Sequence, residues 1–190
     1  MTKNDRERCS WATTDFYKEY HDKEWGKPVH DDGKLFEMLI LEGMQAGLSW
    51  LTILNKRMAF REAFDQFDCK KIALYDEAKI DKLMQNDKII RNRLKIQSAI
   101  VNAQQFIKIQ EEYGSFDAFI WSYVDNKPIH NHFKSEAEIP ATTLLSDKIS
   151  KDLKKHGFKF VGSTIVYAYM QAIGIVNDHV KSCYLYAPDE

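Results

Sequence analysis

The strongest hydrophobic pattern in the chain covers residues 35–54, LFEMLILEGMQAGLSWLTIL. Its apolar residues recur at the spacing of one helix face. That face carries, at positions i, i+3, i+4 and i+7, the side chains of Leu35, Met38, Leu39 and Glu42. The pattern therefore predicts a core helix with a carboxylate on its apolar side.

Two small residues predict that this stretch is a pair of helices. Gly47 is typical of a helix end, and Ser49 is typical of the cap that begins a new helix. Upstream, Asp31 and Asp32 suit the start of the first helix, where the helix dipole favours negative charge. We expect the second helix to reach about Phe64, and the break between the two helices is a place where a pocket can open.

The rest of the chain also favours helices. Helical periodicity predicts further helices over residues 76–83, 89–112, 115–124, 144–153 and 164–173, with a long surface loop over 125–140. No stretch alternates apolar and polar residues for long enough to predict a strand. We therefore expect an all-α fold, formed by a single domain over residues 1–190.

Charge limits how a polyanionic partner could be held. The chain has 27 Lys and Arg and 28 Asp and Glu, a formal charge of -1, so only local basic patches could bind nucleic acid. One patch lies along the helix predicted from residue 89 and the other along the helix from residue 144, although a solvated helix face is the commoner meaning of such a run. The patches consist of Lys88, Arg91, Arg93 and Lys95, and of Lys148, Lys151, Lys154, Lys155 and Lys159.

Three widely spaced cysteines do not form the paired framework of a small secreted domain. The amino terminus has no apolar signal segment, and Glu37 and Glu42 interrupt the apolar stretch, so we expect no membrane span. These features favour a cytoplasmic protein. Cys69 lies among apolar residues and is expected to be a small buried side chain.

Glu42 has two possible meanings. A lone buried carboxylate is costly, so the structural interpretation gives it an Arg or Lys partner from a neighbouring helix. The functional interpretation places it in a pocket, because Gly43 and Gly47 remove side chains nearby and Trp50 follows one turn later. Residues 8–26 also carry a heavy aromatic load, of which most rings should cover the core and one or two could line a site.

The turn from Gly157 to Gly162 leads into the apolar helix predicted over 164–173. A glycine-bounded turn of this kind presents free N–H groups at a positive helix end, which suits a phosphate. His130-Asn131-His132 resembles nuclease and metal motifs, but a triplet without a flanking pattern is weak support for either.

Four residues near the two ends of the chain could bind a metal. His179 and Cys183 are spaced i and i+4, which would place them on one helix face, while Cys9 and His21 offer two more ligands. Two cysteines and two histidines complete a closed tetrahedral zinc site of the structural type. Spacing alone leaves open whether the two ends of the chain meet.

Five motifs in order, RCSW, YHDKEWG, LFEMLILEGMQAGLSW, GFKFVG and VNDH-x3-C, resemble the 3-methyladenine DNA glycosylase I family from about Arg8 to Cys183. The resemblance implies a helix-hairpin-helix type of fold, with a structural zinc that joins the terminal segments and lies remote from the chemistry. The family's zinc ligands correspond to Cys9, His21, His179 and Cys183.

The same resemblance assigns the remaining site residues. It implies that Glu42 contacts the base, that Trp50 stacks on it, and that Leu48 fills the gap left in the duplex. The residues that match aromatic pocket positions are Trp11, Tyr17, Tyr20 and Trp25. The residues that match the DNA-gripping hairpin are Gly157, Lys159, Gly162 and Ser163.

The implied reaction is hydrolysis of the N-glycosidic bond of 3-methyladenine, flipped out of double-stranded alkylated DNA by a monomeric enzyme. The hairpin is not followed by the aspartate of many related glycosylases, so we expect no lyase activity. Two other classes stay open from the residues alone: a non-catalytic zinc-stabilised DNA-binding module, and a zinc hydrolase, which would need an open metal position.

Overall fold

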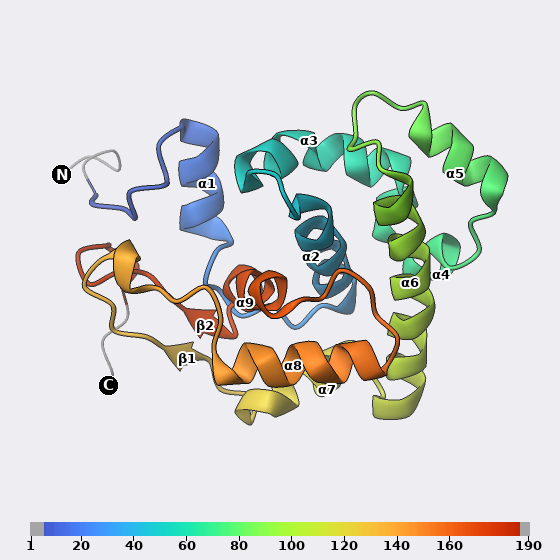
Figure 1. Cartoon of the computed structure of the whole chain (residues 1–190). Helices are drawn as coiled ribbons and strands as arrows, with labels where there is room; N and C mark the ends of the chain where they lie inside the picture. Colours follow the sequence, from blue (N-terminus) through green and yellow to red (C-terminus); the bar gives the residue numbers. More distant parts are fainter. Residues whose placement is uncertain (1–5, 187–190) are drawn as a thin grey trace.

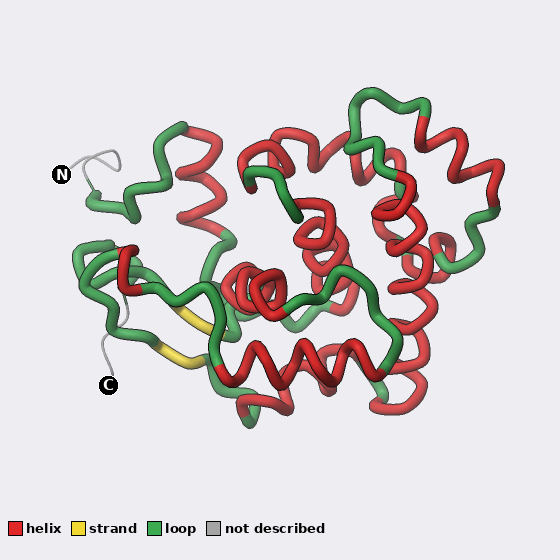
Figure 2. The backbone as a smooth tube through the Cα atoms, viewed as in Figure 1, coloured by secondary structure: helices red, strands yellow, loops and turns green. Residues whose placement is uncertain are grey.

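The computed structural model describes residues 6–186 of the chain. Its α-helices are α1 (Asp15–Lys23), α2 (Asp32–Gln45), α3 (Trp50–Ala63), α4 (Cys69–Ile72), α5 (Glu77–Met84), α6 (Arg93–Tyr113), α7 (Phe116–Trp121), α8 (Leu144–Lys155) and α9 (Ser163–Ala172). Short 3-10 helices form at η1 (Asp65–Phe67), η2 (Ser122–Val124) and η3 (Glu136–Glu138). Helices dominate the tube in Figure 2, so the predicted all-α class is confirmed.

Two short strands, β1 (Ile129–His130) and β2 (Val176–Asn177), form one parallel pair. Ile129 lies opposite Val176, so the long loop is tied to the end of the chain. A two-residue strand is too short to produce an alternating pattern, which explains why the sequence did not predict it.

Helix α2 is the centre of the molecule. It contacts α3, α6, α7 and α9, and its buried residues are part of one continuous apolar cluster with those of the surrounding helices. Figure 1 shows α2 and α9 in the middle, with α6 to the right and α8 below. The pattern that predicted a core helix therefore marks the most enclosed element of the fold.

The predicted helix boundaries near the centre are correct. Asp31 caps α2 by accepting from Lys34 N, and Ser49 caps α3 by accepting from Thr52 N. Gly47, in the turn between them, has φ +79°, a conformation that a side chain disfavours. The sequence therefore specified where α2 and α3 begin and where the break between them lies.

The helix predicted from residue 89 begins later than expected, at Arg93. Asn92 caps it by accepting from Lys95 N, and Ile89 is a buried residue of the preceding loop. Cys69 is also less enclosed than predicted, because it is only half-buried against the core. Within residues 6–186, no helix combines the length and the apolar character needed to cross a membrane.

Candidate base pocket, hairpin and metal cluster

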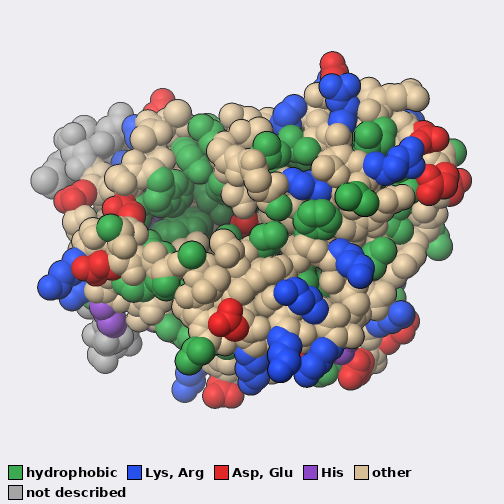
Figure 3. Space-filling view, in the orientation of Figure 1, with side chains coloured by type: hydrophobic (Ala, Val, Ile, Leu, Met, Phe, Trp, Pro, Cys, Tyr) green, Lys and Arg blue, Asp and Glu red, His purple; other side chains and the backbone are tan. Residues whose placement is uncertain are grey.

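A hollow opens on one face of the molecule, bordered by α1, α2, α3 and α9. Figure 3 shows it at the upper left as a depression with a largely apolar lining. Its volume is about 340 Å³, large enough for a planar ring system. The lining residues are Trp11, Tyr17, Tyr20, Trp25, Glu42, Gln45, Trp50, Glu136, Ile139, Ala168 and Gln171.

The structure brings all five expected pocket aromatics to this hollow. Trp11 meets Tyr17 edge-on at 4.9 Å between ring centroids and Trp25 at 5.1 Å. Tyr20, from α1, lies 5.8 Å from Trp50 at the start of α3. The aromatic content of residues 8–26 alone had indicated only one or two site rings, whereas the family motifs correctly indicated four; Phe16 is exposed.

Glu42 projects from α2 into this aromatic surrounding, and only 3% of it is exposed. Its Oε2 atom has no hydrogen-bond partner among the described residues. Burial raises the pKa of Glu42 to about 8, because the charged form loses its hydration. The structural interpretation, in which an Arg or Lys pairs with this carboxylate, is therefore wrong.

The first predicted basic patch forms only in part, because Lys88 and Arg91 are exposed but the other two residues are not available. Only 7% of Lys95 is exposed, and its Nζ donates to the carbonyl oxygens of Met44 (2.8 Å) and Ala46 (2.6 Å), where it satisfies the end of α2. Arg93 is paired with Glu77 and Asp81. The helical spacing could not reveal that a lysine on α6 would be needed at the end of α2.

The second patch forms as predicted. Lysines gather over α8 and the following turn, all with exposed side chains: Lys148, Lys151, Lys154, Lys155 and Lys159. In Figure 3 basic side chains cover this region on the same face as the hollow. This positive surface could hold a DNA backbone while a nucleotide enters the pocket.

The turn between α8 and α9 is held from inside the protein. Asn102 on α6 accepts from Lys159 N (2.8 Å) and donates to Lys159 O (2.9 Å), and Ser150 Oγ donates to Val161 O (2.6 Å). Gly157 has φ +89°, which explains a glycine there. Asn102 was not identified from the sequence, because an asparagine in an apolar helix gives no signal of its partner.

Helix α9 begins without a capping side chain. Gly162 occupies its N-cap position and forms no side-chain hydrogen bond, whereas a side chain caps every other α-helix in the described chain. Ser163 Oγ lies 2.8 Å from Ser146 Oγ. The uncapped end of α9 agrees with the expectation of free N–H groups beside the lysines.

Leu48 lies on the turn between α2 and α3, and 38% of it is exposed. Gln45 fixes this turn, since its Nε2 donates to Leu48 O at 2.9 Å and its own carbonyl accepts from Leu48 N at 2.7 Å. An apolar side chain is thus held at the protein surface between two residues, Gln45 and Trp50, that line the pocket.

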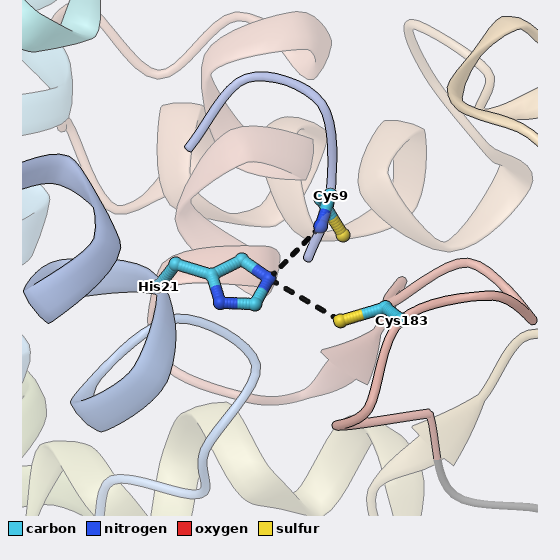
Figure 4. Close-up of side chains that lie close together, drawn as sticks. All are labelled: Cys9, His21 and Cys183. Atoms are coloured by element: carbon cyan, nitrogen blue, oxygen red, sulfur yellow. Dashed lines mark hydrogen bonds between the residues drawn. The ribbon is translucent and has the colours of Figure 1, made fainter. Parts of the chain in front are cut away.

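The two ends of the described chain meet. Cys9, His21 and Cys183 place their ligand atoms within 4.8 Å of one another, and all three are buried. Figure 4 shows them converging from the first loop, from α1 and from the last loop. The neighbouring Cys9 thiol and the His21 ring, whose Nε2 lies 3.4 Å from Cys183 Sγ, lower the pKa of the Cys183 thiol below its ordinary value. This cluster could hold a metal ion.

His179 reaches the cluster by a different route from the one predicted. The segment after β2 is not helical, so His179 and Cys183 do not share a helix face. The His179 ring still lies 4.8 Å from that of His21, with a buried Nε2 that has no partner among the described residues. Burial lowers the pKa of His179 to about 4, which keeps the ring neutral.

Both histidines are oriented in the manner of metal ligands. Their Nδ1 atoms contact oxygen acceptors, Asp22 Oδ1 at 2.9 Å for His21 and Asn177 Oδ1 at 2.7 Å for His179. This arrangement fixes the ring and leaves Nε2 for a metal. A Cβ at Gly26 would lie 2.9 Å from the His179 ring, so a glycine is needed there.

The cluster is closer to the pocket than expected. Trp11 packs on His21 at 5.2 Å between ring centroids, and Trp25 packs on His179 at 4.7 Å. One layer of aromatic rings therefore separates this group of cysteine and histidine side chains from the hollow. The same two tryptophans contact both sites, so a metal held by the cluster would lie outside the pocket, behind its aromatic wall.

Several polar residues of the pocket were missed from the sequence. Glu136 comes from the long loop, where it accepts from Ser10 N at 2.6 Å. Nothing in a loop sequence predicts such a contact. Gln171 had a usable signal, because it is a polar residue within the apolar helix α9.

Comparison with known proteins gives a consistent result. A family model described as methyladenine glycosylase matches residues 11–186. The chain is 49% identical over 181 residues to DNA-3-methyladenine glycosylase 1 of Escherichia coli, covering 95% of this chain and 97% of that protein. It is 48% identical over 177 residues to DNA-3-methyladenine glycosylase of Haemophilus influenzae, covering 93% and 96%.

Solved structures agree over the same length. A crystal structure of 3-methyladenine DNA glycosylase I has a TM-score of 0.93 and 48% identity, and the match covers 95% of this chain and 100% of that chain. The Staphylococcus aureus enzyme of the same name, solved to show how 3-methyladenine is recognised, has a TM-score of 0.92 and 38% identity, covering 96% and 98%. The match spans the pocket, the hairpin and the cysteine cluster.

Proposed function

The chain belongs to the methyladenine glycosylase family, as its motifs indicated, and from this premise we propose that it is a DNA repair enzyme that releases 3-methyladenine from alkylated DNA. The reaction is hydrolysis of the N-glycosidic bond. The observation that supports it best is Glu42, a buried carboxylate without a partner in a pocket walled by aromatic rings.

The pocket suits a cationic base. Methylation of the ring gives adenine a positive charge in DNA, and aromatic faces attract cations, most strongly those of tryptophan. Trp50 supplies such a face, and Glu42 supplies the anion that a cationic base can stabilise. In the free protein, burial raises the pKa of Glu42 to about 8 and keeps the carboxyl group largely protonated at neutral pH. A cationic base that binds beside it favours loss of this proton, because opposite charges attract.

The chemical step needs little help from the protein, because a positively charged base is already a good leaving group. The protein's part is to flip the nucleotide out, hold the base and admit water to the sugar carbon. No lysine is among the described residues that line the pocket, which supports a monofunctional enzyme without a Schiff-base intermediate.

We propose that the DNA is double-stranded and is held by the α8–α9 hairpin. Gly157, Lys159, Gly162 and Ser163 would contact phosphate through the uncapped start of α9 and the lysine surface. Leu48 would fill the gap left by the flipped nucleotide. All these groups come from one chain, which supports a monomer, and three free cysteines favour the reducing cytoplasm.

We propose a structural zinc bound by Cys9, His21, His179 and Cys183. The donor set fits, because all four residues are buried and the partnerless Nε2 of His179 lies beside the other three. Zinc would supply no step of the reaction; it would hold the two ends of the chain and the tryptophan layer in place.

Metal analysis of the purified protein tests the zinc site. We expect about one zinc per chain, lost in Cys183→Ala together with thermal stability. Cys69→Ala is the matched control, since this half-buried cysteine lies outside the cluster and its loss should leave the zinc content unchanged. Equal stability of the metal-free and metal-loaded proteins would rule out a structural role.

Base release from methylated double-stranded DNA tests the function. We expect free 3-methyladenine to appear with multiple turnover, and the DNA strand at the resulting abasic sites to stay intact. Binding of the same DNA without any release of base would favour the non-catalytic DNA-binding module instead. Strand cleavage that tracks base release would contradict a monofunctional enzyme.

A further inference from the structure

Gln171 on α9 links the base pocket to a buried polar network. Its side chain lines the pocket beside Ala168, and its Nε2 donates to Asp178 Oδ2 at 2.8 Å. Gln171 is only half-buried, whereas Asp178 is fully enclosed, at 0% exposure. One end of the Gln171 amide is therefore committed to the protein interior.

The Asp178 carboxylate is surrounded by donors. Tyr167 OH donates to the same oxygen as Gln171, at 2.6 Å, and Asn131 Nδ2 donates to the other oxygen, also at 2.6 Å. A carboxylate that receives donors on both oxygens acts only as an acceptor. The Gln171 amide must therefore present its NH₂ group to Asp178, and rotating the amide by half a turn would bring two oxygens into contact.

The fixed orientation directs Gln171 Nε2 towards Asp178 and leaves Oε1 as the acceptor that this side chain can offer to the pocket. Oε1 accepts no hydrogen bond from any described residue. The pocket thus contains an acceptor whose amide cannot turn to offer a donor instead. Such an atom separates ligands by whether they present a donor or an acceptor to it.

We propose that Gln171 is a specificity-determining residue, whose Oε1 accepts a hydrogen bond from the exocyclic amino group of 3-methyladenine. This inference rests on the proposed function. An adenine-derived base carries an amino group, which donates, at the ring position where a guanine-derived base carries an oxygen, which only accepts. Gln171 therefore favours 3-methyladenine over 3-methylguanine, with Asp178 as the positioning residue behind it.

The test uses one substrate, DNA treated with a methylating agent, which contains both 3-methyladenine and 3-methylguanine. Single-turnover release rates of the two bases give a selectivity ratio for each protein. Gln171→Met keeps the length of the side chain and removes the acceptor. We expect the ratio to fall by roughly 10- to 100-fold, the scale of losing one well-placed hydrogen bond, mainly through slower release of 3-methyladenine.

Tyr167→Phe is the matched control. It removes the other donor to Asp178 Oδ2 but leaves Gln171 anchored, and Tyr167 does not line the pocket. We expect it to keep the wild-type ratio. A wild-type ratio in folded Gln171→Met overturns the inference, and so does an equal fall of the ratio in both variants, since general loosening of the network would then explain it.

These outcomes are distinct from failure of the proposed function. If the wild-type protein released neither base, the enzyme assignment itself would be wrong. If it released 3-methyladenine and Gln171→Met kept the wild-type ratio, only the role of Gln171 would be lost. Melting temperature and metal content of each variant, measured beside the rates, establish that the compared proteins are equally folded.

Discussion

Helix α2 carries two buried carboxylates with opposite surroundings. Glu37 is 7% exposed, and it accepts from Arg57 Nε at 2.7 Å and from Arg61 Nε at 2.9 Å. Glu42 is 3% exposed and its Oε2 has no partner among the described residues. The two carboxylates are therefore similarly buried, but Glu37 is paired with arginines and Glu42 is not.

The difference comes from where α3 packs. Five residues along a helix turn the side chain by about 140°, so Glu37 and Glu42 leave α2 in different directions. Arg57 and Arg61, one turn apart on α3, meet Glu37. Glu42 instead faces the aromatic rings of the pocket. A buried carboxylate thus identifies a functional site only when its partners are known to be missing.

The largest expected effect comes from removing the charge of Glu37, the carboxylate that is paired with arginines. Glu37→Gln keeps the shape but leaves two arginines short of a partner, and we expect the free energy of unfolding to fall by about 3 kcal/mol. The loss should be at the lower end of the range for a broken buried pair, because Glu24 still contacts Arg57. Urea unfolding measures it, with exposed Glu62→Gln as the control; equal stability of both variants would contradict a structural role for Glu37.

The second effect concerns Glu42, the carboxylate without a partner. Glu42→Gln replaces a buried carboxyl group that has no partner with an uncharged amide, so the variant should be at least as stable as the wild type. Excision of 3-methyladenine should nevertheless fall about 10- to 150-fold, or roughly 1.5 to 3 kcal/mol, the scale of a charged hydrogen bond. Melting curves and base release are measured on the same sample. Full activity in a stable variant would remove Glu42 from the site.

The sequence predicted the fold well because its boundaries rest on local chemistry. Asp31, Ser49 and Gly47 act through bonds to residues a few positions away, so their roles can be derived from neighbouring residues. The family motifs also led to a pocket that the structure does form. Helical periodicity alone predicted that Glu42 is buried, but it could not predict that the carboxylate lacks a partner.

The remaining features depend on contacts between distant segments. Lys95 satisfies carbonyl groups about fifty residues away, and Gln171 is oriented by Asp178, whose other donors come from a loop and from α9. His179 reaches its cluster from a non-helical segment. Periodicity describes one element at a time, so it could not predict these partners or the single aromatic layer between metal cluster and pocket.

A third effect is the part of the pH dependence of stability that comes from Glu42 and is lost in Glu42→Gln. Its pKa is raised to about 8 in the folded protein, from 4.5. The folded state therefore binds more protons between these pH values, and stability falls as the pH rises through this window. We expect the stability of Glu42→Gln to rise relative to that of the wild type as the pH increases from about 5 to about 8. Urea midpoints that change in parallel for both proteins would contradict the raised pKa.

The smallest effect concerns how much each of the two arginines that pair with Glu37 contributes to stability. The Arg57 side chain is 13% exposed and bridges Glu37 and Glu24, whereas the Arg61 side chain is 32% exposed. Water screens the more exposed pair, so Arg61→Met should cost only about 1 kcal/mol of unfolding free energy, and Arg57→Met should cost more. Because neither arginine lines the pocket, both variants should release 3-methyladenine at the wild-type rate at a temperature where they are folded. Slow release by folded Arg57→Met would show that the ion pair of Glu37 also affects the pocket. The distinction between a structural Glu37 and a functional Glu42 would then be wrong.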